Sequence, residues 1–129
     1  LALAELVMSQ RLPWHLRLLV SAVDNAISGN AYRPGDVIRT RSGQTVEIDN
    51  TDAEGRVVLC DAMTYAAEQQ PDLMIDFATL TGAARIALGP DLPPVFGNRD
   101  PIRDALVKVS HAVQDPLWPM PLWAPYQDM

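Results

Sequence analysis

"TVEIDNTDAEGRVVLCDAMTYA", residues 45–66, passes from an alternating pattern to a helical one through a short polar turn. The alternation of apolar and polar side chains over residues 45–48 predicts a strand. Over residues 56–69 the apolar side chains recur at helical spacing, which predicts an amphipathic helix that Pro71 ends. A strand followed closely by a helix is the unit from which α/β folds are built, so this stretch decides the fold class.

Two further segments, "HLRLLVSAV" (residues 15–23) and "DLMIDFATL" (residues 72–80), are compact apolar runs of strand length. Such runs are typical of strands inside a parallel sheet that is covered on both faces. Helical patterns occupy residues 1–10 and 101–113, and residues 37–40 are expected to form a hairpin with the strand at 45–48. Strands that alternate with helices predict an α/β domain with a largely parallel sheet flanked by helices.

Two loops follow predicted strands, at residues 50–55 and 79–82. The carboxyl ends of parallel strands meet at one edge of a sheet, and ligands of α/β proteins gather at that edge. We therefore expect the two loops to share one site.

The composition of the chain argues against two classes of binding partner. A formal net charge of -6 and a pI near 4.6 argue against nucleic acid or an anionic membrane surface. No apolar run reaches the roughly 18 residues that a membrane helix needs. The single cysteine, Cys60, cannot form an internal disulfide, which favours a reducing, cytoplasmic location.

The chain begins in the middle of a helical pattern and ends without a terminating signal, so we expect it to be part of a longer protein.

The turn "NTDAEGR", residues 50–56, has three interpretations. Thr51 followed three residues later by Glu54 is a capping box, which would start the helix without any further role. Alternate oxygen-bearing residues followed by Gly55 also resemble a calcium loop, with Asp61 at the closing position. However, that position favours the longer glutamate, and an EF-hand needs a helix before the loop where this chain has a strand pattern.

The third interpretation is a dinuclear metal site. In an extended segment residues i and i+2 project to the same side, so Asp52 and Glu54 would face one point. Two divalent ions about 3.5–4 Å apart need a carboxylate that bridges them. Arg56 is permanently cationic and cannot be a ligand, so beside the metals it would hold an anion or stabilise developing negative charge.

The second loop has two interpretations. Thr81 and Gly82 precede a helical pattern, so free backbone N–H groups there would favour an anion or an oxyanion. The alternative is an ordinary turn from strand to helix, with Thr81 as the N-cap.

Together, "SGNAYRPGD" (28–36), "NTDAEGR" (50–56) and "DLMIDFATLTGA" (72–83) closely resemble the leucine aminopeptidase, or cytosol aminopeptidase, family in order and spacing. The resemblance implies that Asp52 binds one metal ion, that Glu54 bridges two, and that Arg56 holds a bicarbonate-like anion that serves as base. It also implies that three residues line the substrate and anion pocket: Thr79, Leu80 and Gly82.

The resemblance further implies a hexameric enzyme that uses two divalent ions, Zn or Mn with Mg as a further option. Such an enzyme removes a leucine-like N-terminal residue from peptides with a free α-amine, through a two-metal-activated water. The alternative is a non-catalytic assembly or binding domain that keeps the fold.

The family's remaining ligands, a lysine and two aspartates, lie upstream of the "SGNAYRPGD" motif, together with a second lysine near the substrate. Only 27 residues precede Ser28, and they contain no lysine. We therefore expect residues 1–129 to be part of a metallo-aminopeptidase catalytic domain that lacks its upstream ligand segment and its C-terminal end. By itself this part is expected to be inactive.

Overall fold

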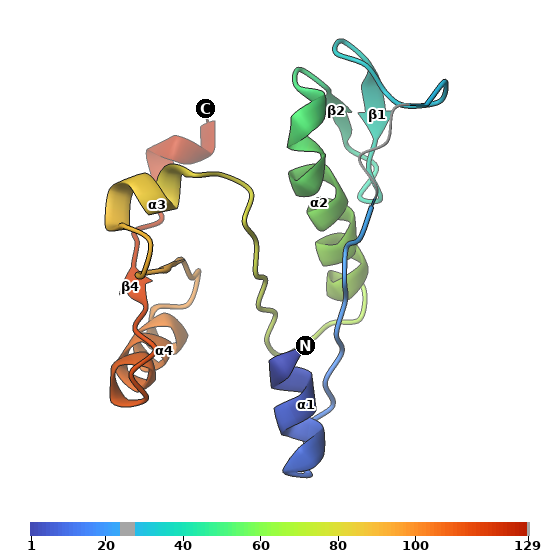
Figure 1. The fold of residues 1–129 in the computed structure, drawn as a ribbon. Coiled ribbons are helices and arrows are strands. Elements are labelled where there is room, and N and C mark those ends of the chain that lie inside the picture. The colour runs from blue at the N-terminus through green and yellow to red at the C-terminus, as the bar shows by residue number, and fades with distance from the viewer. Residues whose placement is uncertain (24–27, 129) are drawn as a thin grey trace. The chain divides into compact units, whose positions relative to one another are not determined.

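The computed structural model describes residues 1–23 and 28–128 (Figure 1). The chain divides into two compact units, Leu1–Leu80 and Thr81–Met129, and each is described by itself. Among the described residues no helix combines the length and the apolar character needed to cross a bilayer.

The first unit is built around a helix and a hairpin. It contains α1 (Ala2–Ser9), β1 (Val37–Arg39), β2 (Thr45–Glu47), the short 3₁₀ helix η1 (Thr51–Ala53) and α2 (Glu54–Ala67). The strands β1 and β2 pair antiparallel, with Ile38 opposite Val46. Gly43 turns the chain between them with φ of 86°, a conformation that glycine adopts without steric cost. Figure 1 shows the hairpin beside α2.

Ile48, directly after β2, lies where the chain leaves the hairpin for the turn at residues 50–55. Its side chain is only 4% exposed. Its N–H donates to the carbonyl oxygen of Asp36 (2.8 Å), and its own carbonyl accepts from the N–H of Gly35 (2.7 Å). The hairpin bonding therefore continues to the residue at which the turn leaves the sheet.

The second unit contains α3 (Ala83–Leu88), β3 (Pro94–Val95), α4 (Asp100–Ala112), β4 (Trp118–Pro119) and the 3₁₀ helix η2 (Ala124–Asp128). The two short strands pair parallel, with Pro94 opposite Trp118. Pro101 stands in the first turn of α4, where its missing N–H costs no hydrogen bond. A parallel strand pair joined through a helix is the α/β arrangement on a small scale.

The helices at 56–69 and 101–113 and the hairpin are confirmed, within two residues at the helix ends. The prediction of strands over residues 15–23 and 72–80 is wrong. Both segments are among the described residues, and both lack regular secondary structure. A strand exists only through ladder hydrogen bonds to a neighbour, and an apolar pattern supplies none. All residues from 72 to 80 are exposed, and Phe77 reaches 82%.

Candidate metal centre

Local hydrogen bonding shapes the turn between β2 and α2. Asn50 has an extended backbone (φ -128°, ψ 118°), and its side-chain Oδ1 accepts from the N–H of Asp52 at 2.9 Å. This is the N-cap of η1, after which Glu54 opens α2. The cap of η1 is thus Asn50, and no hydrogen bond of the capping box considered for Thr51 and Glu54 forms. Asn50 competes successfully because an asparagine side chain readily bonds the N–H two residues on.

This geometry bears on the other two interpretations of the turn. Residues 51–53 form a helical turn, so the rule that residues i and i+2 of an extended segment face one side does not apply to Asp52 and Glu54. A calcium loop is excluded as well, because α2 begins at Glu54, inside the stretch that would have to remain a loop.

The side chain of Glu54 combines a buried oxygen atom with a place beside a hollow in the first unit. Its Oε2 atom is buried and has no hydrogen-bond partner among the described residues. The side chain lines a hollow of about 370 Å³, together with Ser21, Ala22, Val23, Gly55 and Val58. Buried carboxylate oxygens nearly always have a partner, so an unpartnered one beside a hollow is suited to a cation. The residues at the end of the 15–23 segment that line this hollow were not singled out from the sequence.

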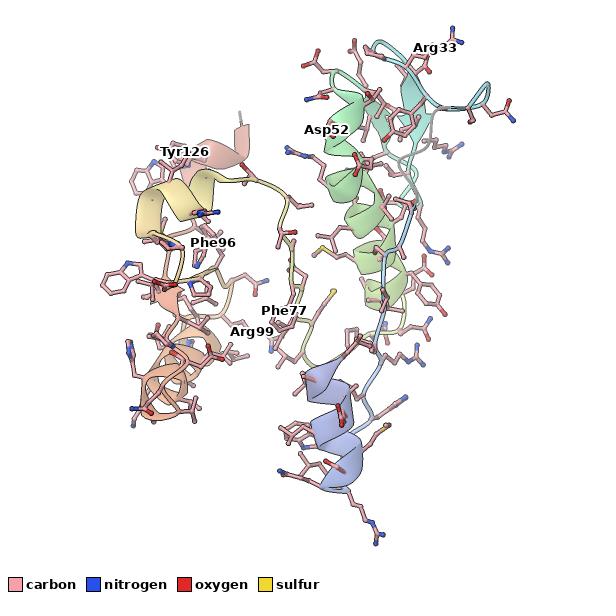
Figure 2. All side chains as sticks on the ribbon, in the orientation of Figure 1. Arg33, Asp52, Phe77, Phe96, Arg99 and Tyr126 are labelled. Carbon is pink, nitrogen blue, oxygen red and sulfur yellow. The ribbon has the colours of Figure 1, made fainter. Side chains whose placement is uncertain are left out.

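Asp52 and Arg56 are both exposed. Figure 2 shows Asp52 at the N-terminal end of α2. Arg56 lines a second hollow of about 350 Å³, whose wall includes Glu47, Asp49 and Asn50. Glu54 and Arg56 thus border different hollows, as expected for residues two apart on a helix, which point about 200° apart. Whether Arg56 serves an anion beside the metals stays a prediction.

The loop at residues 79–80 meets the first turn of α2. A methyl group placed on Gly55 would lie 2.9 Å from Leu80 Cδ2, so the two residues are in close contact. The first turn of α2, the end of the 15–23 segment and the loop at 79–80 therefore lie together in the first unit. Whether the loops at 50–55 and 79–82 share one site stays a prediction.

Gly82 belongs to the second unit, where it is the N-cap of α3 with φ of -76° and ψ of -3°. The Thr81 hydroxyl accepts from the N–H of Ala83 at 3.3 Å. The N-cap is therefore Gly82 and not Thr81, although the threonine hydroxyl still satisfies one free N–H of the helix start.

The donors in the first unit fit a divalent metal in type. Asp52 and Glu54 offer carboxylate oxygens, and one oxygen of Glu54 is buried without a partner. Across residues 1–23 and 28–128, no group of three or more His, Cys, Asp or Glu side chains is arranged to hold a metal ion. The two acids therefore match a metal centre in donor type only, and their role as ligands stays a prediction.

Comparison with known proteins finds matches along the whole chain. Residues 1–129 match the family model described as "Cytosol aminopeptidase family, catalytic domain". The chain is 48% identical over 128 residues to a probable cytosol aminopeptidase of Roseiflexus castenholzii, covering 99% of this chain and 25% of that protein. It is 50% identical over 119 residues to a probable cytosol aminopeptidase of Xylella fastidiosa, covering 92% of this chain and 24% of that protein. The chain thus spans about a quarter of the length of these relatives.

Solved structures agree with the predicted fold. A crystal structure of cytosol aminopeptidase from Coxiella burnetii has a TM-score of 0.90 and 58% identity, over 98% of this chain and 28% of that one. A mutant of tomato leucine aminopeptidase has a TM-score of 0.78 and 42% identity, over 83% of this chain and 21% of that one. The backbone is similar to both over most of its length, which confirms the predicted α/β class and the family resemblance.

Proposed function

Because this chain belongs to the cytosol aminopeptidase family, we propose that the full-length protein is a metal-dependent aminopeptidase. The observation that carries the proposal is the buried Oε2 of Glu54, which has no hydrogen-bond partner among the described residues and lies beside a hollow lined by residues 21–23 and the first turns of α2. A carboxylate in that position favours a bound cation, since burial without a partner is costly for a charged group.

In the proposed centre the carboxylates of Glu54 and Asp52 would hold two divalent ions, with Zn, Mn or Mg as the metals. Their carboxylate oxygens are suitable ligands for all three ions. When bound, such a pair polarises a carbonyl group and lowers the pKa of water toward neutrality. The other ligands of the centre come from the rest of the protein, so residues 1–129 alone are an incomplete and inactive part of the catalytic domain.

Arg56 contributes a fixed positive charge, because a guanidinium does not lose its proton in the physiological range. We assign to it the binding of a bicarbonate-like anion, which when bound would supply a base for the hydrolysis. Thr79, Leu80 and Gly82 line the pocket for the substrate and this anion. The contact between Leu80 and Gly55 supports this assignment for the part of the loop in the first unit.

The substrates in this proposal are peptides with a free α-amine and a leucine-like first residue. The proposed assembly is a homohexamer in the cytoplasm. These assignments follow the family resemblance, and the relatives' printed names, cytosol aminopeptidase and leucine aminopeptidase, agree with the substrate and the location.

The test uses the full-length protein supplied with Mn²⁺ or Zn²⁺ and a chromogenic leucyl amide. We expect leucine release by the wild type and its loss in Glu54→Ala and Glu54→Gln, with bound metal per subunit reduced in both. Glu5→Gln, an exposed acid in α1, is the matched control and should retain activity and metal. Equal activity in the Glu54 variants would refute the proposal and favour a non-catalytic assembly or binding domain.

A further inference from the structure

Gly55 is the second residue of α2, and the backbone gives it no special role. The glycines with positive φ are Gly35, Gly43 and Gly89, while Gly55 has ordinary helical geometry. Alanine is a better helix former than glycine at such a position, because glycine loses more conformational freedom on folding. The helix alone would therefore favour alanine at residue 55.

The neighbour of Gly55 explains why a side chain does not fit there. A methyl group on Gly55 would lie 2.9 Å from Leu80 Cδ2, whereas carbon atoms in good contact are about 3.5–4.0 Å apart. The atom in the way ends a side chain that is 43% exposed, so Leu80 has room to swing outward. A methyl group at residue 55 would thus displace Leu80 without requiring the helix to move.

We propose that Gly55 is a positioning residue: its bare Cα lets the loop at 79–80 close against the turn that carries Glu54. This inference rests on the proposed function, because it concerns the alignment of the substrate loop with the metal ligands. Gly55 touches neither metal nor substrate in this role. It acts through Leu80 alone.

The test is a double-mutant cycle in the full-length protein loaded with Mn²⁺. The four proteins are the wild type, Gly55→Ala, Leu80→Ala and the double variant, each assayed for kcat/KM on the chromogenic leucyl amide. Gly55→Ala should lower kcat/KM by about tenfold to a hundredfold, since the displaced Leu80 side chain no longer holds its place in the proposed substrate pocket. In the Leu80→Ala background, which removes the obstructing atom, the same change should alter kcat/KM by less than about twofold.

Two further readouts separate positioning from general damage. Bound metal per subunit should be equal in all four proteins, because no ligand is changed. Gly55→Ala should raise Tm less when residue 80 is leucine than when it is alanine, since only in the alanine background does the gain in helix propensity come without a displaced neighbour. Gly29→Ala is the matched control, because a methyl group at Gly29 meets no atom within 4 Å.

Equal losses of kcat/KM in both backgrounds, or loss of bound metal in Gly55→Ala, would overturn the inference while leaving the proposed function intact. A wild type without activity would instead refute the proposed function, and the positioning role with it. The two failures are therefore distinguishable in the same set of proteins.

Discussion

Arg41 and Glu68 form a two-pronged ion pair, with Nε donating to Oε1 at 2.8 Å and Nη2 donating to Oε2 at 2.9 Å. The pair joins the tip of the β1–β2 hairpin to the C-terminal end of α2. The Arg41 N–H also donates to Oδ1 of Asp61 (2.8 Å), and the guanidinium lies 4.9 Å from the centre of the Tyr65 ring. Through these contacts the hairpin is fastened along the helix whose first residue is Glu54.

The first prediction is that Arg41→Lys lowers Tm by a small, measurable amount. Lysine keeps the charge but loses the planar fork that binds both oxygens of Glu68. The effect should be small because the two side chains are 45% and 44% exposed, and exposed pairs contribute little. Thermal unfolding of the full-length protein measures it, with Arg39→Lys on the neighbouring strand as the control. Equal Tm values for both variants would show that the fork is dispensable.

The second prediction concerns pH. Hydrogen bonding from Arg41 lowers the pKa of Glu68 below its ordinary value of 4.5. A carboxyl group with a lowered pKa in the folded state stabilises that state fully above pH 4.5, and the contribution is lost as the pH falls through the folded value. The Tm difference between wild type and Glu68→Gln should therefore shrink as the pH is lowered from 7 toward 3. A difference that stays constant over this range would contradict the assignment.

The third prediction is that Asn50→Ala destabilises the turn before α2. Removal of an N-cap side chain costs about 1 kcal/mol, because the N–H of Asp52 loses its partner. Since this turn carries both proposed ligands, the affinity of the full-length protein for Mn²⁺ should fall as well. Asn50→Asp keeps the acceptor oxygen and should retain the stability. Isothermal titration and thermal unfolding give the two readouts, and unchanged values in Asn50→Ala would exclude the cap as a determinant of the turn.

The fourth prediction tests how α4 is joined to β4. The Ser110 hydroxyl, in a residue only 6% exposed, donates to the Val107 carbonyl at 2.8 Å and accepts from the Leu117 N–H at 3.0 Å. Ser110→Ala leaves that N–H without a partner, which should cost about 1–3 kcal/mol. The amide of Leu117 should then exchange its hydrogen faster with solvent.

Ser9→Ala provides the control for Ser110. Its hydroxyl also bonds a helix carbonyl, that of Leu6 at 3.1 Å, but at an exposed position where water can replace the lost partner. The stability change at Ser9 should therefore be clearly smaller than at Ser110. Equal changes would show that burial of the Ser110 hydroxyl has no special importance.

The helices and the hairpin could be predicted from the sequence because their hydrogen bonds close over short distances along the chain. Apolar spacing located α2 and α4, and the two short strand patterns at 37–40 and 45–48 located the hairpin. The acidic turn at 50–54 was recognised from the sequence. Its geometry was not, because residues 51–53 form a 3₁₀ helix where an extended segment had been assumed. Whether Thr51 or Asn50 caps it depends on a competition between two similar side chains that the sequence pattern does not resolve.

The sequence by itself determined the family, the helical segments and the acidic turn, since each is encoded in a continuous motif. Only the tertiary structure decided that residues 15–23 and 72–80 lack a strand partner among the described residues, that Glu54 has a buried oxygen without a hydrogen bond, and that Leu80 presses against Gly55. The physical reason is distance along the chain. Strand pairing, burial and close contact arise between residues far apart in sequence, and no local pattern specifies which of them meet.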